Sequence, residues 1–239
     1  MGRPVRLAVI LAFALGGTAP AVAQVGYDPR GSPYRDVAKG HTITAIGGYL
    51  SGDGGRFGIA PQTGPFGGIR YEIRNSNTIA FALQVIYGDF DRLIVNPFVT
   101  PANRVSGPVK QSVTFTEASL QFNLTGGKTW HRLAPFFSTT IGLAFPSGTP
   151  QDTSGFELGH KVTLAPGVGF RLFLTEAIHL RAEARGMFWK LNYPASFTRE
   201  PIEDPGTPGD SHAVITDGNV SEWDTSGWFQ AGLGFAFSP

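Results

Sequence analysis

Trp228-Phe229-Gln230-Ala231-Gly232-Leu233-Gly234-Phe235-Ala236-Phe237-Ser238-Pro239 closes the printed sequence and is the stretch that decides the fold class. One parity of this segment is apolar, whereas the other holds Trp228, Gln230 and small residues. Successive side chains of a β-strand point to opposite faces, so the pattern predicts a strand with one apolar face. Such a strand suits the final seam of a membrane barrel, and the residues expected to face lipid are Phe229, Leu233, Phe235 and Phe237.

Seven further segments show alternation of the same kind. The clearest is 66–74, where Ile69, Tyr71 and Ile73 alternate with charged residues. In 41–50 both parities are equally apolar, so the sequence leaves the inward face of that strand open. The seven predicted strands are 41–50, 66–74, 79–87, 112–124, 133–145, 161–174 and 177–190.

The connections between these strands alternate in length. Three are short, at 75–77, 126–132 and 175–177, and four are long, at 51–65, 89–111, 146–160 and 191–226. Outer-membrane barrels combine short periplasmic turns with longer extracellular loops in this way. The sequence therefore predicts an all-β fold, an eight-stranded antiparallel up-and-down transmembrane β-barrel over 41–239, preceded by an irregular periplasmic lead-in at 24–40.

The second long connection is unusually apolar from Arg92 to Val99. Three interpretations remain open for it: the segment extends the flanking strands, folds over the barrel mouth, or touches a partner or lipid head groups.

The first residues of the chain are typical of an export signal. Arg3 and Arg6 precede an apolar run at 7–15, and Ala21-Val22-Ala23 offers a small-x-small cleavage pattern. The run is too short for a membrane-spanning helix, which needs about 20 residues. We expect residues 1–23 to be a signal peptide cleaved near Ala23, and the mature chain to enter the outer membrane of a Gram-negative-type bacterium as β-structure.

Charge and composition exclude several classes of function. Without residues 1–23 the chain has 17 basic and 18 acidic residues, a net charge of −1, so no strong field for nucleic acid is expected. The absence of cysteine excludes disulfides, thiol chemistry and cysteine-ligated metals. No two histidines have the spacing of metal ligands, so neither a metal nor a cofactor is expected.

Charged residues occupy the parity expected to face the lumen, and two of the strands carry the same Arg-x-Glu-x-Arg sequence. Spacing by two keeps each triplet on one face. Side chains just fill the interior of an eight-stranded barrel, so the charges are expected to plug it, in a structural role. Five arginines face three glutamates, which predicts that loop acids or water complete the network of Arg70, Glu72, Arg74, Glu117, Arg171, Arg181, Glu183 and Arg185.

Three alternatives compete with a non-enzymatic structural or surface-interaction role. A narrow channel for small hydrophobic molecules would need a continuous cavity past the inward glycines Gly142, Gly167, Gly169, Gly232 and Gly234. A soluble, exported lipocalin-like binding barrel would turn the apolar parity inward. An outer-membrane lipid-modifying enzyme would need a histidine beside a serine and an acid, an arrangement not evident at His41, His131, His160, His179 or His212.

In its strand alternation, one-sided long loops and apolar closing strand, the chain resembles the small bacterial outer-membrane β-barrels, including the OmpA transmembrane domain and the OmpW-like and OmpX-like proteins. This resemblance implies a monomer that contacts outer-membrane lipid and the barrel-assembly machinery, with surface ligands reached through the long loops. One feature departs from the family, whose closing strand usually ends on an aromatic residue. Here Ser238 and Pro239 follow Phe237, which puts the terminal assembly signal in doubt.

Overall fold

The structure is a computed structural model that describes residues 31–207 and 209–238. The barrel belongs to the compact unit that begins at Pro33. The expected signal peptide and its cleavage near Ala23 lie outside the described residues, as does the lead-in before residue 31.

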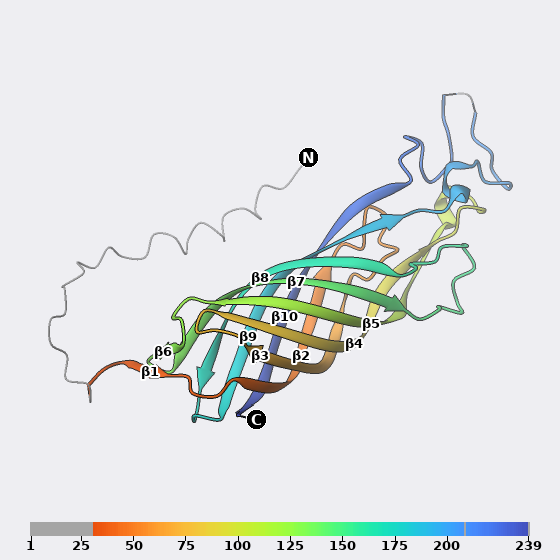
Figure 1. The fold of residues 1–239 in the computed structure, drawn as a ribbon. Helices are drawn as coiled ribbons and strands as arrows, with labels where there is room; N and C mark the ends of the chain where they lie inside the picture. The colour runs from red at the N-terminus through yellow and green to blue at the C-terminus, as the bar shows by residue number, and fades with distance from the viewer. Residues whose placement is uncertain (1–30, 208, 239) are drawn as a thin grey trace. The chain divides into compact units, whose positions relative to one another are not determined.

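Eight long strands form a closed antiparallel barrel, as the sequence predicts (Figure 1). Each strand pairs with its neighbours along the chain, and the last strand pairs with the first. The eight strands are β2 (His41–Gly52), β3 (Thr63–Arg74), β4 (Ile79–Val95), β5 (Val105–Asn123), β7 (Leu133–Pro146), β8 (Lys161–Phe173), β9 (Ile178–Asn192) and β10 (Ser221–Phe237).

The seam between β10 and β2 runs the full length of β2. Phe229 lies opposite Tyr49, and Phe237 lies opposite His41 at the end of the ladder. The closing strand is therefore paired on both sides, which removes the exposed edge that an open sheet would offer for aggregation. Apart from strands the described residues form only two short 3-10 helices, η1 (Pro101–Asn103) and η2 (Ala195–Thr198), and no helix in this part of the chain is long and apolar enough to cross a membrane.

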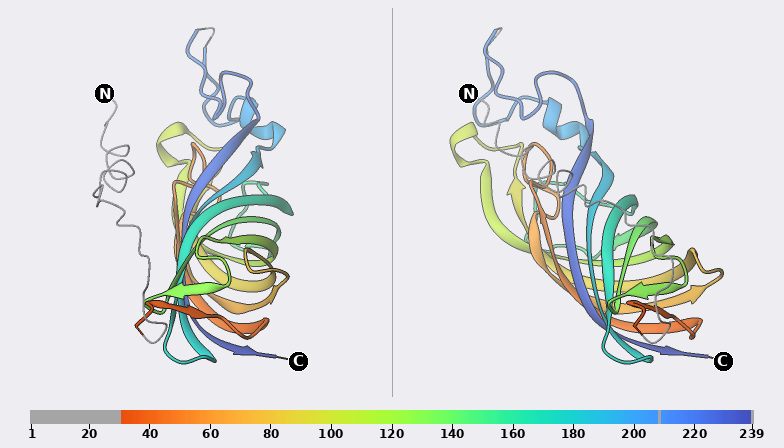
Figure 2. Two further views of the ribbon diagram at one scale, coloured as in Figure 1. Left: turned by 60° about the vertical axis from the view of Figure 1, so that its left-hand side comes forward. Right: turned by 90° about the vertical axis from the view of Figure 1, so that its left-hand side faces the viewer.

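Two short strands lie at the turn end of the barrel. The lead-in was expected to be irregular, but three of its residues form β1 (Tyr34–Asp36), which pairs with β6 (Lys128–Trp130) in the connection between β5 and β7. The Val37 N–H then donates to the Gly127 carbonyl, and the Gly40 carbonyl accepts from the Arg74 N–H. The described part of the lead-in is thus hydrogen-bonded to the turn end of the barrel (Figure 2).

At the other end several strands continue beyond the predicted limits. Arg92, Ile94 and Val95 pair with β5, so the first of the three interpretations is correct for residues 92–95, whereas residues 96–99 lie in a loop. This extension leaves loops at 53–62, 96–104, 147–160 and 193–220, all at one end of the barrel (Figure 1).

The outer surface of the barrel is apolar. Leu83, Val162 and Ile69 are each more than 60% exposed, and on the closing strand Phe229, Leu233 and Phe235 are more than half exposed while Phe237 is half-buried. The sequence leaves open which side chains of β2 face the lumen, and in the structure Ile43 and Tyr49 face outward. Because the apolar parity faces outward and the Arg-x-Glu-x-Arg parity inward, the lipocalin-like interpretation is wrong.

Candidate functional site: a lumen closed in two layers

The turn-side half of the lumen is filled by an ion-pair network centred on Glu72. Its carboxylate contacts three guanidinium groups, those of Arg171 at 2.8 Å and of Arg70 and Arg181 at 3.4 Å. The four side chains come from β3, β8 and β9, and all are at least 94% buried. Spacing by two along β3 and β9 makes this possible, because it directs every second side chain into the barrel.

The other two glutamates extend the network, since Glu183 shares Arg181 with Glu72 and Glu117 holds Arg185. Arg181 contacts Glu183 at 2.9 Å, and Arg185 contacts Glu117 at 2.8 Å. Gln230 on β10 connects the groups, since its amide donates to Glu183 and its carbonyl accepts from Arg185. Neutral groups complete the network: Gln84 donates to Glu117, Ser138 donates to Glu183, and Gln121 and Asn123 accept from Arg181 and Arg171.

The inward glycines give the large side chains of this network their space. A Cβ placed on Gly167 would lie 2.5 Å from Arg185 Cγ, and one on Gly142 would lie 2.7 Å from Glu117 Cγ. At Gly234 and Gly169 the positions are taken by the rings of His179 and Phe136. The space beside these four glycines is therefore filled by neighbouring side chains. It does not form the continuous cavity that a hydrophobic channel would need.

The loop-side half of the lumen is closed by aromatic side chains. Trp228 stacks on Phe66 with ring centroids 4.0 Å apart and meets the edge of Phe115 at 5.2 Å. Phe115 also stacks with Trp189 and meets Phe90 edge to face. All five rings are buried, and the guanidinium of Arg185 lies 4.8 Å from the Trp228 ring, so a cation–π contact joins this layer to the charge network.

Above the aromatic layer the loops fold over the mouth. Ile59 from the first loop, Phe156 from the third, and Phe197 and Ile215 from the fourth belong to the same buried apolar cluster. Glu222 joins the first and fourth loops, because it accepts from the Arg56 N–H and from the Tyr193 hydroxyl. Burial and the hydrogen bond to Glu222 raise the pKa of Tyr193. The sequence did not predict that the loops contribute to a core.

A buried ion pair lies beneath the third loop. Arg92, on the extension of β4, contacts Asp152 at 2.7 Å, and the pair lines a pocket of about 630 Å³ together with Gln111 and Phe156. Burial alone would raise the pKa of Asp152, but hydrogen bonds from Ser154 and the adjacent Arg92 guanidinium hold it below its ordinary value. The loop is thus secured to the strand extension by an ionised carboxylate.

Of the eight residues expected in the lumen network, the structure brings seven into ion pairs. Arg74 is inward and half-buried, and within the described residues it has neither an ion pair nor a side-chain hydrogen bond. In the described part of the chain no loop acid forms an ion pair with the network, because the aromatic layer lies between them, and the alternative that water completes the network stays a prediction. The signal that sequence reasoning missed is a change along the inward parity, from polar near the turns to apolar near the long loops, as in Phe66, Ile86, Phe115, Met187, Trp189 and Trp228.

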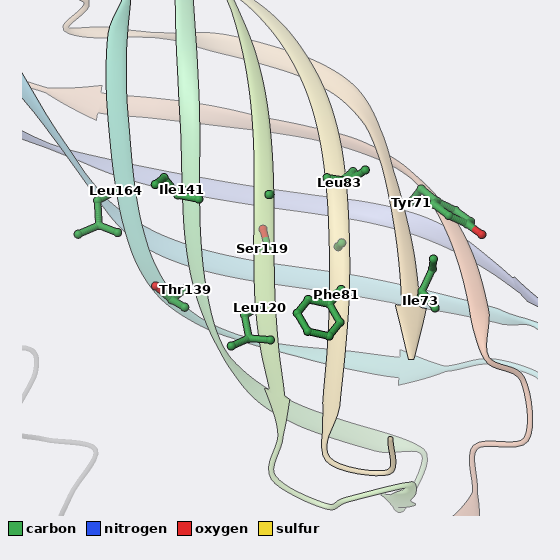
Figure 3. Close-up of a pocket in the computed structure, with 11 residues that line it drawn as sticks. Tyr71, Ile73, Phe81, Leu83, Ser119, Leu120, Thr139, Ile141 and Leu164 are labelled. Atoms are coloured by element: carbon green, nitrogen blue, oxygen red, sulfur yellow. The ribbon is translucent and has the colours of Figure 1, made fainter. Parts of the chain in front are cut away.

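The membrane-facing surface carries an apolar groove of about 520 Å³ over β5. Figure 3 shows Leu83 and Phe81 from β4, and Ile141 and Thr139 from β7, on either side of β5. The groove exists because the outward residue between them on β5 is the small Ala118. It lies on the outside of the barrel and makes no path through the lumen.

No family model matches the sequence, and no curated protein matches it. Among solved structures, the fold is similar to the outer membrane protein OprG from Pseudomonas aeruginosa, with a TM-score of 0.50 and 13% identity over 84% of this chain and 98% of that one. Neisserial surface protein A is matched at a TM-score of 0.48 and 14% identity over 86% and 98% of the two chains. The N-terminal β-barrel domain of OprF from Pseudomonas aeruginosa is matched at 0.45 and 12% over 83% and 98%.

At these identities the likeness concerns the fold. The resemblance expected from the sequence is confirmed at that level: the chain has the eight-stranded antiparallel β-barrel fold of small outer-membrane proteins such as OprG.

Proposed function

We propose that this protein is exported to the outer membrane of a Gram-negative-type bacterium, has no catalytic activity, and acts through the surface that its loops present outside the cell. Its barrel serves as a sealed membrane anchor for that surface. Outer-membrane lipid and the barrel-assembly machinery are its expected contacts, and the isolated barrel is expected to be a monomer.

The observation that carries this proposal is the closure of the lumen by two layers of different chemistry. A charge network with three glutamates and four buried arginines occupies the turn-side half, and a cluster of aromatic rings occupies the loop-side half. A solute crossing the barrel would have to displace both. Such displacement would leave buried charges without partners, which is expensive in free energy.

A hydrophobic channel is the alternative that this closure weighs against. The inward glycines lie beneath other side chains, and the apolar half of the lumen ends at Arg185 and Glu183. An apolar solute would therefore meet ionised groups halfway through the barrel.

The arrangement of serine and histidine weighs against a lipid-modifying enzyme. Ser211 and His212 are adjacent in the fourth loop, but Ser211 donates to Glu200 while His212 contacts Asp204. The serine hydroxyl thus has no histidine to take its proton. His179 is buried in the lumen against the ring of Phe173, away from any surface where a lipid ester could reach it.

Conductance in planar lipid bilayers tests the sealed lumen. The purified, refolded protein is expected to give no stable channel. Trp228→Ala removes the central ring of the aromatic layer, and Phe229→Ala is its matched control, since Phe229 is the next residue on β10 and faces lipid. A stable conductance in the wild type would overturn the proposal of a sealed anchor.

Adhesion of cells tests the loop surface. Cells displaying the wild type are compared with cells displaying a form in which residues 199–214 are replaced by a short Gly-Ser linker, on surfaces coated with collagen, laminin or fibronectin. Heat-modifiable migration in SDS gels verifies that both barrels fold. Equal adhesion of the two cell types on every surface would contradict a role of this loop in surface interaction.

A further inference from the structure

The turn-side half of the lumen carries more positive than negative charge. Five arginines point into it, and only three glutamates are there to neutralise them. Glu72 alone is shared among Arg70, Arg171 and Arg181, and Glu117 and Glu183 are occupied by Arg185 and Arg181. Two positive charges are left without a counter-charge in a compartment surrounded by lipid-facing strands, where charges are poorly screened.

The acids on the loop side do not supply the missing charge. Asp152 is paired with Arg92, and Asp217 is paired with Arg56. Glu222 accepts from Tyr193, and Asp224 accepts from the indole of Trp189. The aromatic layer also lies between these acids and the arginines.

The acids at the turn end do not supply it either. Asp36 and Glu176 line a pocket of about 310 Å³ beside Phe173, but two arginines, Arg35 and Arg132, line the same pocket. Charges of the two signs are equal in number there. Compensation for the lumen must therefore come from solution on the turn side.

Arg74 is the group at which that compensation would begin. It is half-buried, its Nη1 atom is buried without a hydrogen-bond partner, and it lies opposite Ala80 on β4, whose side chain is a single methyl group. Within the described residues, six further buried nitrogen atoms around the network have no hydrogen-bond partner: Nδ2 of Asn123, Nδ1 of His179, and the Nε atoms of Arg70, Arg171, Arg181 and Arg185. Asn123 is held in place by Arg171, which donates to its Oδ1 atom at 2.7 Å.

We propose that the turn-side lumen binds a small oxyanion, such as inorganic phosphate, that enters from the turn end and pairs with Arg74 next to the cluster of Arg171, Asn123 and His179. Guanidinium groups present planar pairs of N–H donors that suit such an anion. The anion neutralises the excess charge and so stabilises the folded barrel. This inference goes beyond the proposed function, since a sealed anchor and an open channel could both hold such an anion.

Unfolding by urea, an uncharged denaturant, tests the proposal on the full mature chain folded in uncharged detergent. At constant ionic strength, exchange of chloride for inorganic phosphate should lower the unfolding equilibrium constant by the factor 1 + [phosphate]/Kd, which is about tenfold when phosphate is ten times its dissociation constant. Arg74→Gln should abolish this response. Arg132→Gln is the matched control, because Arg132 is an exposed arginine at the same end outside the network, and it should leave the response intact.

A second variant adds the missing charge instead of removing the excess. Ala80→Asp places a carboxylate directly opposite Arg74, so the barrel should be more stable in chloride and insensitive to phosphate. A phosphate response of wild-type size in Arg74→Gln would overturn the proposal whether or not Ala80→Asp folds. Vesicles of phosphatidylglycerol without free phosphate should give no Arg74-dependent stabilisation, and stabilisation there would overturn the luminal location of the site.

Discussion

The two halves of the lumen are built by the same strands but by opposite chemistry. Near the turns the inward residues are arginine, glutamate and their amide partners, whereas near the loops they are tryptophan, phenylalanine and isoleucine. The charged half depends on each group keeping its partner, because an unpaired buried charge is expensive. The aromatic half depends on close packing, and the stability lost when one of its rings is truncated depends on the volume of the cavity left behind. The same barrel thus fails in two different ways.

The largest effect is expected from removal of the carboxylate shared by three arginines. Glu72→Gln leaves Arg70, Arg171 and Arg181 with less counter-charge and should lower the free energy of unfolding by about 3 to 5 kcal/mol, measured by urea unfolding in micelles. Glu176→Gln, at an exposed glutamate in the turn between β8 and β9, is the control. An effect equal to that of the control would show that water replaces Glu72 without difficulty.

Damage to the aromatic half should have a somewhat smaller effect. Trp228→Ala should lower the free energy of unfolding by about 3 kcal/mol. This is the low end of the range for a buried tryptophan, because Phe66 and Arg185 can relax into the space. Phe229→Ala on the lipid-facing side of the same strand should cost much less in the same unfolding experiment. If the two substitutions had equal effects, the loop-side layer would not be a packed core.

The ion pair beneath the third loop should contribute less again and should depend on pH. Asp152→Asn leaves the buried Arg92 guanidinium without its carboxylate and should lower the local opening free energy of the loop by about 1 to 3 kcal/mol at pH 7, measured by hydrogen exchange over 147–160.

The sign of the pH dependence follows from the lowered pKa of Asp152. A carboxyl group with a lower pKa in the folded state stabilises it fully above its unfolded pKa of about 4, and this contribution is lost as pH falls through the lower folded value. Wild type and Asp152→Asn should therefore begin to converge as pH falls below about 4, and should be equal once pH lies below the lowered folded pKa of Asp152. A difference that persists at lower pH would mean that Asp152 acts through shape and hydrogen bonding alone.

The smallest effect is expected for an exposed ion pair between β4 and β5. Lys110 contacts Asp91 at 2.8 Å on the outside of the β4–β5 extension, and Lys110→Gln should change stability by less than about 1 kcal/mol. High salt should erase the difference from wild type. A larger, salt-resistant effect would remove the distinction between exposed and luminal ion pairs in this barrel.

Much of the fold was predictable because it depends on local alternation. The parity of 66–74 and of the closing strand can be read residue by residue, and turn lengths distinguish the two rims. The ends of the strands were less predictable, because Arg92 to Val95 and Val105 to Val109 carry no strong alternation and are held by pairing with each other. The short strand Tyr34–Asp36 likewise exists only because Lys128–Trp130 lies beside it.

The sequence predicted which residues belong to the candidate site better than it predicted the contacts between them. The sequence indicated which charges face inward, but not that Glu72 would be shared by three arginines while Arg74 stays apart. It also placed Trp228 on the inward parity without showing that Phe66 and Phe115 would meet it.

The sequence by itself determined eight strands, the apolar outer faces of all of them except β2, and the end of the barrel that carries the long loops, because alternation and turn length are properties of neighbouring residues. The tertiary structure alone decided which face of β2 points inward, which charges pair across the lumen, and that the loops complete an apolar layer. These features depend on the tilt and stagger with which strands distant in sequence close into a barrel, and no single strand contains that information.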